Sequence, residues 1–140
     1  MSRIFGIDFG LKRVGMAVTD PLRIIASALT TKPQAEALGF IQRYCTDEEV
    51  AAFVVGLPLY PDGNPAQIAA QADEFARRLQ QLFPDKPVYR QDERYTSNQA
   101  KQIILHSGAK KGKRRDKALV DKVAAALILE QFMQENYWNK

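Results

Sequence analysis

The sequence predicts a mixed-sheet α/β fold with helices on both faces of the sheet, and three observations carry this prediction. Short apolar runs separated by turn residues come first, which is typical of consecutive antiparallel strands. Apolar runs then alternate with segments of helical periodicity, which is typical of strands joined by helices. The run 50–57 (VAAFVVGL) is apolar throughout, as expected for a strand covered on both faces. With 140 residues, of which 46% are hydrophobic, the chain is expected to form one domain over residues 1–140.

Local signals set the bounds of the expected elements. Gly15 lies on a face of small residues that could approach a packed helix closely. Asn64 followed by Pro65 is typical of a helix N-cap and first turn, and Thr96 with Gln99 resembles a capping box. In chain order, we expect strands over 4–9, 14–19 and 23–31, a helix over 34–44, a strand over 50–57, a helix from 65 to about 83, a strand over 88–92, and helices over 96–106 and about 117–135.

The composition excludes several classes of protein. No apolar run approaches the roughly 18 residues that span a bilayer, so no membrane partner is expected. The opening MSRIFGIDFG turns polar too early for a secretory signal. A single cysteine, Cys45, excludes an internal disulfide framework and fits a small core position in a cytoplasmic protein.

The positive charge is concentrated in one segment. The net charge is +4, and residues 107–117 (SGAKKGKRRDK) carry six Lys and Arg residues against one acid, Asp116, which we expect to lie in solvent. A localised basic segment favours a polyanion partner, although a solvated connector would have the same composition. The cations predicted to bind nucleic acid are five of the six in this segment and two from elsewhere in the chain: Arg13, Arg94, Lys110, Lys111, Lys113, Arg114 and Arg115.

Three acids occupy places where an unpaired carboxylate is costly. Asp8 ends the first apolar strand, Glu93 follows the last strand, and Asp121 shares a helical face with apolar residues in ALVDKVAAALIL. Each has a structural alternative. Asp8 could bond the backbone of the turn that follows it, Glu93 could pair with Arg94 or lie in solvent, and Asp121 could pair with Lys117, four residues before it.

Taken together, the three acids favour a metal site. Strand ends in such a sheet converge on one edge, and a neighbouring helix can bring a third carboxylate there. A divalent cation neutralises carboxylates that would otherwise repel one another, and oxygen ligands without His or Cys favour Mg²⁺ or Mn²⁺. Two such ions, about 3.5–4 Å apart, can activate a water and stabilise the leaving oxygen of a phosphodiester. We therefore expect a nuclease whose catalytic residues and metal ligands are Asp8, Glu93 and Asp121.

The motifs GIDFGLKRVGMAVTD, VVGLPLYPDG, DERYTS and VDKVAAALIL, in this order, resemble those of the YqgF/RuvX family. The resemblance covers nearly the whole chain. It implies an RNase H-like fold and a metal-dependent nuclease that matures the 5′ end of pre-16S ribosomal RNA. The family was earlier proposed to resolve Holliday junctions. It also places the acidic site at Asp8, Glu93 and Asp121.

The sequence departs from the related RuvC resolvases at one point. Those proteins keep an acid at the end of the fourth strand, whereas this chain has VVGLP there, so Glu93 would have to substitute. Asp92 is an alternative to Glu93, but strand alternation sends neighbouring residues to opposite faces, and only one should reach the site.

Other functions remain open on the sequence. A D-x-G hairpin also begins actin-like and sugar-kinase ATPases, although these need two such lobes to enclose a nucleotide. A non-catalytic RNA-binding factor in ribosome assembly is a second alternative. For a nuclease, both structured RNA and branched DNA are candidate substrates, and both a monomer and a homodimer are compatible with the sequence.

Overall fold

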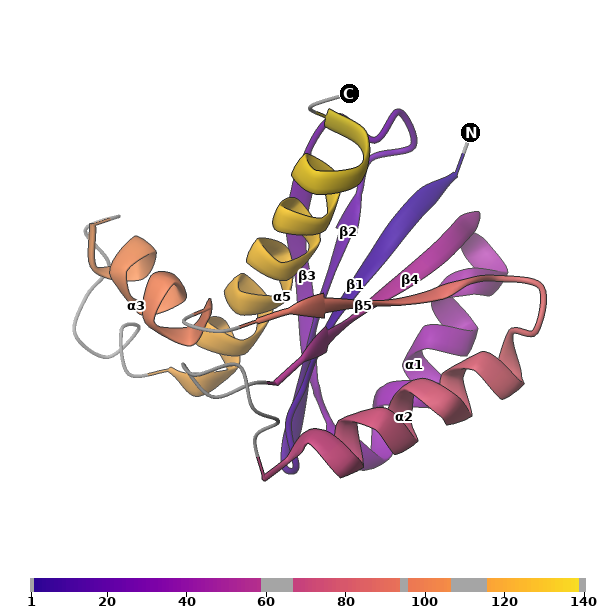
Figure 1. Cartoon of the computed structure of the whole chain (residues 1–140), viewed down its shortest axis with the longest axis horizontal. Coiled ribbons are helices and arrows are strands. Elements are labelled where there is room, and N and C mark those ends of the chain that lie inside the picture. Colours follow the sequence, from indigo (N-terminus) through magenta and orange to yellow (C-terminus); the bar gives the residue numbers. More distant parts are fainter. Residues whose placement is uncertain (1, 59–66, 94–95, 107–115, 139–140) are drawn as a thin grey trace.

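The computed structural model of the chain describes residues 2–58, 67–93, 96–106 and 116–138 (Figure 1). Its elements are strands β1 (Arg3–Phe9), β2 (Arg13–Thr19) and β3 (Ala26–Pro33), helix α1 (Gln34–Asp47), strand β4 (Val50–Leu57), helix α2 (Ala69–Leu82), strand β5 (Val88–Asp92), helices α3 (Thr96–His106) and α5 (Lys117–Met133), and a final π-helical turn, η1 (Gln134–Trp138). Across the described helices, none combines the length and the apolar composition that crossing a membrane requires.

The five strands form one mixed sheet in the order β3-β2-β1-β4-β5. β1 pairs with β2, and β2 with β3, in antiparallel fashion, whereas β4 lies parallel to both β1 and β5. This is the mixed sheet that the sequence predicts, with a meander first and helix crossovers after it. The end of β1 lies in the middle of the sheet, where Asp8 is opposite Gly15 of β2.

Helices cover both faces of the sheet. α1 and α2 lie on one face and α5 on the other, as Figure 1 shows, and α3 packs against α5. Alternate residues of β1 face the helices on opposite sides of the sheet: Phe5 and Ile7 pack with α1 and α2, whereas Ile4 packs with α5. Asp8 has the same parity as Ile4, and therefore belongs to the α5 face.

Gly15 allows α5 to approach the sheet closely. A Cβ atom at this position would overlap the carbonyl group of Asp121 and lie 2.9 Å from the backbone nitrogen of Lys122. The small face predicted for this strand is thereby confirmed. The same contact fixes the height of Asp121 above the sheet.

Several element boundaries differ from the prediction: β1 and β2 each begin one residue earlier, β3 extends to Pro33, and α1 extends to Asp47. The third strand begins at Ala26 rather than at residue 23, because the Asp20 carboxylate accepts hydrogen bonds from the backbone N–H groups of Ile24 and Ile25, and Arg23 takes a positive φ of 61°. An Asx-type turn thus replaces the first part of the expected strand. The last α-helix ends two residues early, where the chain passes into η1.

The starts of three helices also bear on the predictions. α2 begins at Ala69, and the expected start at Asn64 and Pro65 lies outside the described residues. Thr96 is the first helical residue of α3 rather than the cap before it. Asp116 is exposed as expected, but it also has a structural role: its carboxylate accepts hydrogen bonds from the N–H groups of Ala118 and Leu119 and caps α5.

Candidate active site

The three predicted acids line one pocket of about 470 Å³ at the end of β1. The pocket is formed by the end of β1, the β1–β2 turn, the start of β2, the residue before α2, the residue after β5 and the first turns of α5. Its lining residues are Asp8, Phe9, Gly10, Leu11, Lys12, Arg13, Ile68, Glu93, Lys117 and Asp121.

Asp8 and Glu93 are in direct contact. Both side chains are partly buried, and their carboxyl groups are joined by a hydrogen bond. Removal from water raises the pKa of Asp8 well above its ordinary value near 3.8, and the charges of Glu93 and Asp121 raise it further. Burial also raises the pKa of Glu93, while the hydrogen bond from Asp8 opposes that rise. Both carboxyl groups are therefore easier to protonate than free ones, as expected for neighbouring carboxylates removed from water.

Glycine on β4 makes room for Glu93. The Glu93 backbone continues the β4–β5 ladder, because its N–H donates to the carbonyl of Leu57. A Cβ atom at Gly56 would lie only 2.8 Å from Cδ of Glu93 and 2.9 Å from Cδ1 of Ile128. The side chain of Glu93 thus lies over the end of β4. Asp92 does not line the pocket, so of the two alternatives it is Glu93 that the structure brings to Asp8.

Asp121 is held by a cation from the sheet. Nε of Arg13 donates to Oδ2 of Asp121 at 2.6 Å, and both side chains are partly exposed. The partner is therefore Arg13, and not Lys117 as the alternative based on helical spacing had it. The first turn of α5 is also tied to β3, because the hydroxyl of Thr31 donates to the carbonyl of Ala118 at 2.6 Å.

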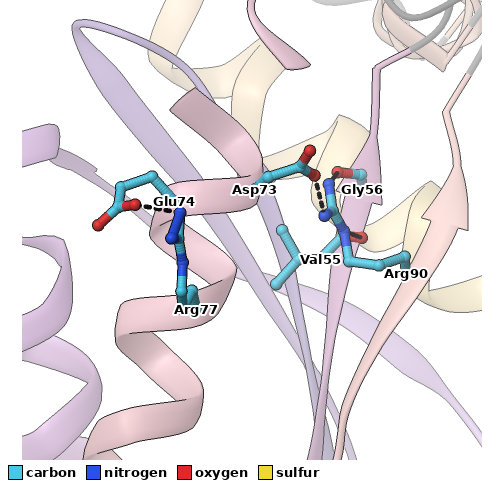
Figure 2. A network of polar contacts seen from close by, with 6 residues as sticks. All are labelled: Val55, Gly56, Asp73, Glu74, Arg77 and Arg90. Atoms are coloured by element: carbon cyan, nitrogen blue, oxygen red, sulfur yellow. Dashed lines mark hydrogen bonds and ion pairs between the residues drawn. The ribbon is translucent and has the colours of Figure 1, made fainter. Parts of the chain in front are cut away.

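Arg90 of β5 braces the strand end on which the site depends (Figure 2). Its guanidinium donates to the carbonyl oxygens of Val55 and Gly56, at 3.2 and 3.1 Å, and to the carboxylate of Asp73 on α2. One side chain thereby joins β5, β4 and α2. The positive charge of Arg90 also lowers the pKa of Glu93, against the effect of burial.

The predicted cations divide into two groups. Arg13 lines the pocket, whereas Arg94, Lys110, Lys111, Lys113, Arg114 and Arg115 lie outside the described residues. Sequence reasoning missed two cations that line the pocket, Lys12 and Lys117. Both had a signal: Lys12 lies in the turn directly after the Asp8 strand, and Lys117 lies one helical turn before Asp121.

The donor set suits a hard divalent cation. Carboxylate oxygens are the ligands that Mg²⁺ and Mn²⁺ prefer, and the pocket gathers three of these groups. Within the described residues, no three acidic, His or Cys side chains stand in an arrangement that would hold a metal ion directly. In this structure Asp121 is instead paired with Arg13, and Asp8 with Glu93.

Comparisons with known proteins agree with the fold. A family model described as "RuvX: Holliday junction resolvase" matches residues 2–135. Proteins named "Putative pre-16S rRNA nuclease" from Christiangramia forsetii and Porphyromonas gingivalis are 44% and 46% identical to the chain. They align with 96% and 95% of it, and with 100% and 96% of their own length.

Two solved structures share the architecture at low sequence identity. The Fowlpox virus resolvase bound to Holliday junction DNA has a TM-score of 0.61 at 11% identity, with 97% of this chain and 99% of that chain covered. RuvC of T. thermophilus in complex with a Holliday junction has a TM-score of 0.52 at 20% identity, with 96% of each chain covered. These neighbours establish the RNase H-like fold of RuvC-type resolvases, and the match to the family model and the close relatives establish that the chain belongs to the RuvX family.

Proposed function

We propose that this chain is a nuclease that hydrolyses phosphodiester bonds in structured RNA and acts in the maturation of pre-16S ribosomal RNA. The observation that carries the proposal is the meeting of Asp8, Glu93 and Asp121 in one open pocket. The names of the close relatives support the substrate. The single free cysteine, Cys45, is in keeping with action in the cytoplasm.

The carboxylates would act by holding divalent cations. When bound, Mg²⁺ or Mn²⁺ would supply an activated water and charge stabilisation for the leaving oxygen, with two ions as the proposed number. Asp8, Glu93 and Asp121 would be the residues that hold them. The raised pKa values of Asp8 and Glu93 fit this role, because a site that gathers negative charge away from water favours a cation strongly.

The cations around the pocket would hold the nucleic acid. Lys12 and Lys117 line the pocket beside the acids and would contact phosphates next to the scissile bond. The basic segment, Lys110 to Arg115, leads directly to α5 in the sequence and would add contacts that do not depend on base sequence. Of the apolar residues that line the pocket, Leu11 is the most exposed.

Cleavage of branched DNA is the second candidate activity, because the matching family model is described as a Holliday junction resolvase. The test is to incubate the purified protein with labelled pre-16S RNA and, separately, with a four-way DNA junction, in Mg²⁺, Mn²⁺ or EDTA. We expect cleavage of the RNA with either cation and none in EDTA. Cleavage of the junction alone would replace the RNA assignment, and cleavage in EDTA would contradict the role of the carboxylates.

A further inference from the structure

Arg13 and Asp121 form an ion pair between two rigid elements. Arg13 is the first residue of β2, opposite Pro33 of β3, and the carbonyl of the preceding Lys12 accepts a hydrogen bond from the N–H of Gln34. On the other side, α5 is fixed by its close contact with Gly15. Neither backbone can move freely, so the 2.6 Å bond between the side chains reflects a built arrangement rather than a loose surface pair.

This ion pair lies within the candidate active site. Both of its residues line the pocket that also contains Asp8 and Glu93. The charge of Asp121 is close enough to raise the pKa of Asp8, so Arg13 neutralises one acid of an interacting group of three. A metal cation that bound all three carboxylates would therefore compete with Arg13 for Asp121.

We infer that Arg13 is a positioning residue that holds the Asp121 carboxylate and yields it when a divalent cation binds, which frees the guanidinium for a substrate phosphate. The inference rests on the proposed function, since it concerns the same site. It assigns Arg13 two successive partners of the same chemistry, first a carboxylate and then a phosphate. Both are oxyanions, the carboxylate planar and the phosphate tetrahedral, and a guanidinium can bind either one through two parallel N–H groups.

Such competition predicts the sign of a mutational effect. Removing Arg13 frees Asp121 and also removes a positive charge beside the cation, so cation binding should tighten. Two unit charges about 4 Å apart in water interact strongly enough to change an equilibrium about fivefold, and a divalent ion has twice the charge. We therefore expect at least about a fivefold lower dissociation constant for Mn²⁺ in Arg13→Gln. If Arg13 instead only oriented Asp121 as a ligand, its loss should weaken binding.

The test measures Mn²⁺ binding by isothermal titration calorimetry on the whole protein without nucleic acid. Lys12→Gln is the matched control, because it removes a neighbouring charge of the same pocket without freeing a paired acid. We expect Arg13→Gln to tighten Mn²⁺ binding by clearly more than Lys12→Gln. Equal effects, or weaker binding in Arg13→Gln, would overturn the inference. Arg13→Lys, which keeps the charge and loses the planar fork, should lie between wild type and Arg13→Gln, and it serves in place of the glutamine variant should that fail to fold.

A second arm separates this inference from the function on which it rests. Asp121→Asn should weaken Mn²⁺ binding and should abolish the gain produced by Arg13→Gln, since the gain requires the freed carboxylate. A gain that persists in the double variant would overturn the role of Arg13. If the wild-type protein bound no Mn²⁺ at all, the proposed function would fail. Normal Mn²⁺ binding with no response to Arg13→Gln would instead refute the inference alone.

Discussion

Replacing Gly15 with alanine should both destabilise the protein and displace an acid of the site. The added Cβ would overlap the carbonyl carbon and oxygen of Asp121 and lie 2.9 Å from the backbone nitrogen of Lys122, within the 3.0 Å that real Cβ contacts essentially never breach. These are backbone atoms, so no side-chain rotation can relieve the overlap. Either α5 must lift from β2, or the strand must bend away from the helix.

The size of the effect follows from how firmly α5 is held. Overpacking a core costs about 1–3 kcal/mol, and the upper end applies here because Thr31 also fixes the first turn of the helix. Against this, alanine reduces the conformational freedom of the unfolded chain by about 0.4–1 kcal/mol relative to glycine. The net loss in the free energy of unfolding should be about 2 kcal/mol. For a chain of this length, that corresponds to a fall in Tm of roughly 4–8 °C.

The assay is urea denaturation followed by circular dichroism, with Gly39→Ala as the control. Gly39 lies in α1, where an added Cβ would meet nothing closer than the Arg43 guanidinium at 3.5 Å. Alanine there should stabilise the helix by about 0.5–1 kcal/mol. The two variants should therefore move in opposite directions. A Gly15→Ala protein as stable as wild type would refute the close approach of α5, and with it the placement of Asp121.

Three further predictions concern charge. Asp8→Asn should become more stable relative to wild type as the pH rises from about 3.8 to neutral. Folding raises the pKa of Asp8, so the wild type is most stable when this group is protonated and loses stability as it ionises. The loss is about 1.4 kcal/mol for each pH unit between the pKa of the unfolded chain and that of the folded protein. Thermal melts across this range test the trend, and a constant difference would contradict it. Arg90→Ala should cost about 1–3 kcal/mol because it removes a hydrogen-bond donor from two carbonyl groups of β4. Arg77→Ala, which breaks the exposed pair with Glu74, should cost less than about 1 kcal/mol (Figure 2). Equal losses in urea titrations would argue against the bracing role of Arg90. Changing Lys110, Lys111, Arg114 and Arg115 to Ala should weaken nucleic-acid binding regardless of base sequence. In fluorescence-anisotropy titrations, the slope of log K against log salt should fall by about 0.7–0.9 for each lost phosphate contact. An unchanged slope would mean that the segment is only a connector.

Much of the fold can be predicted from the sequence because local signals and tertiary packing agree. The strand over 50–57 and the strand over 88–92 have the predicted bounds, since an uninterrupted apolar run and flanking prolines define them locally. The predicted start of the third strand was wrong because Ile24 and Ile25 look like strand residues. Their backbone N–H groups are instead taken by Asp20, and their side chains are about 60% exposed. The hydrogen bonds from these N–H groups to the Asp20 side chain therefore outweighed the β propensity of the two isoleucines.

The candidate site could be predicted only in outline. The convergence of Asp8 and Glu93 follows from strand ends that meet at one edge, and it requires no knowledge of side-chain positions. The pairing of Arg13 with Asp121 joins residues 108 positions apart and depends on how α5 crosses β2, which no local pattern encodes. The role of Gly56 is equally hidden, since a glycine in an apolar strand does not indicate which side chain will lie over it.

The central claim is that the clustered carboxylates perform metal-dependent hydrolysis, and the most direct measurement compares cleavage of labelled pre-16S RNA by Asp8→Asn and Asp47→Asn in Mg²⁺. Both changes remove one carboxylate charge, but Asp47 is exposed at the end of α1, far from the pocket in sequence and not among its lining residues. We predict that Asp47→Asn cleaves at the wild-type rate, while Asp8→Asn is folded, at least as stable as wild type at neutral pH, and without detectable cleavage. A folded Asp8→Asn protein that cleaves at the wild-type rate would contradict the account.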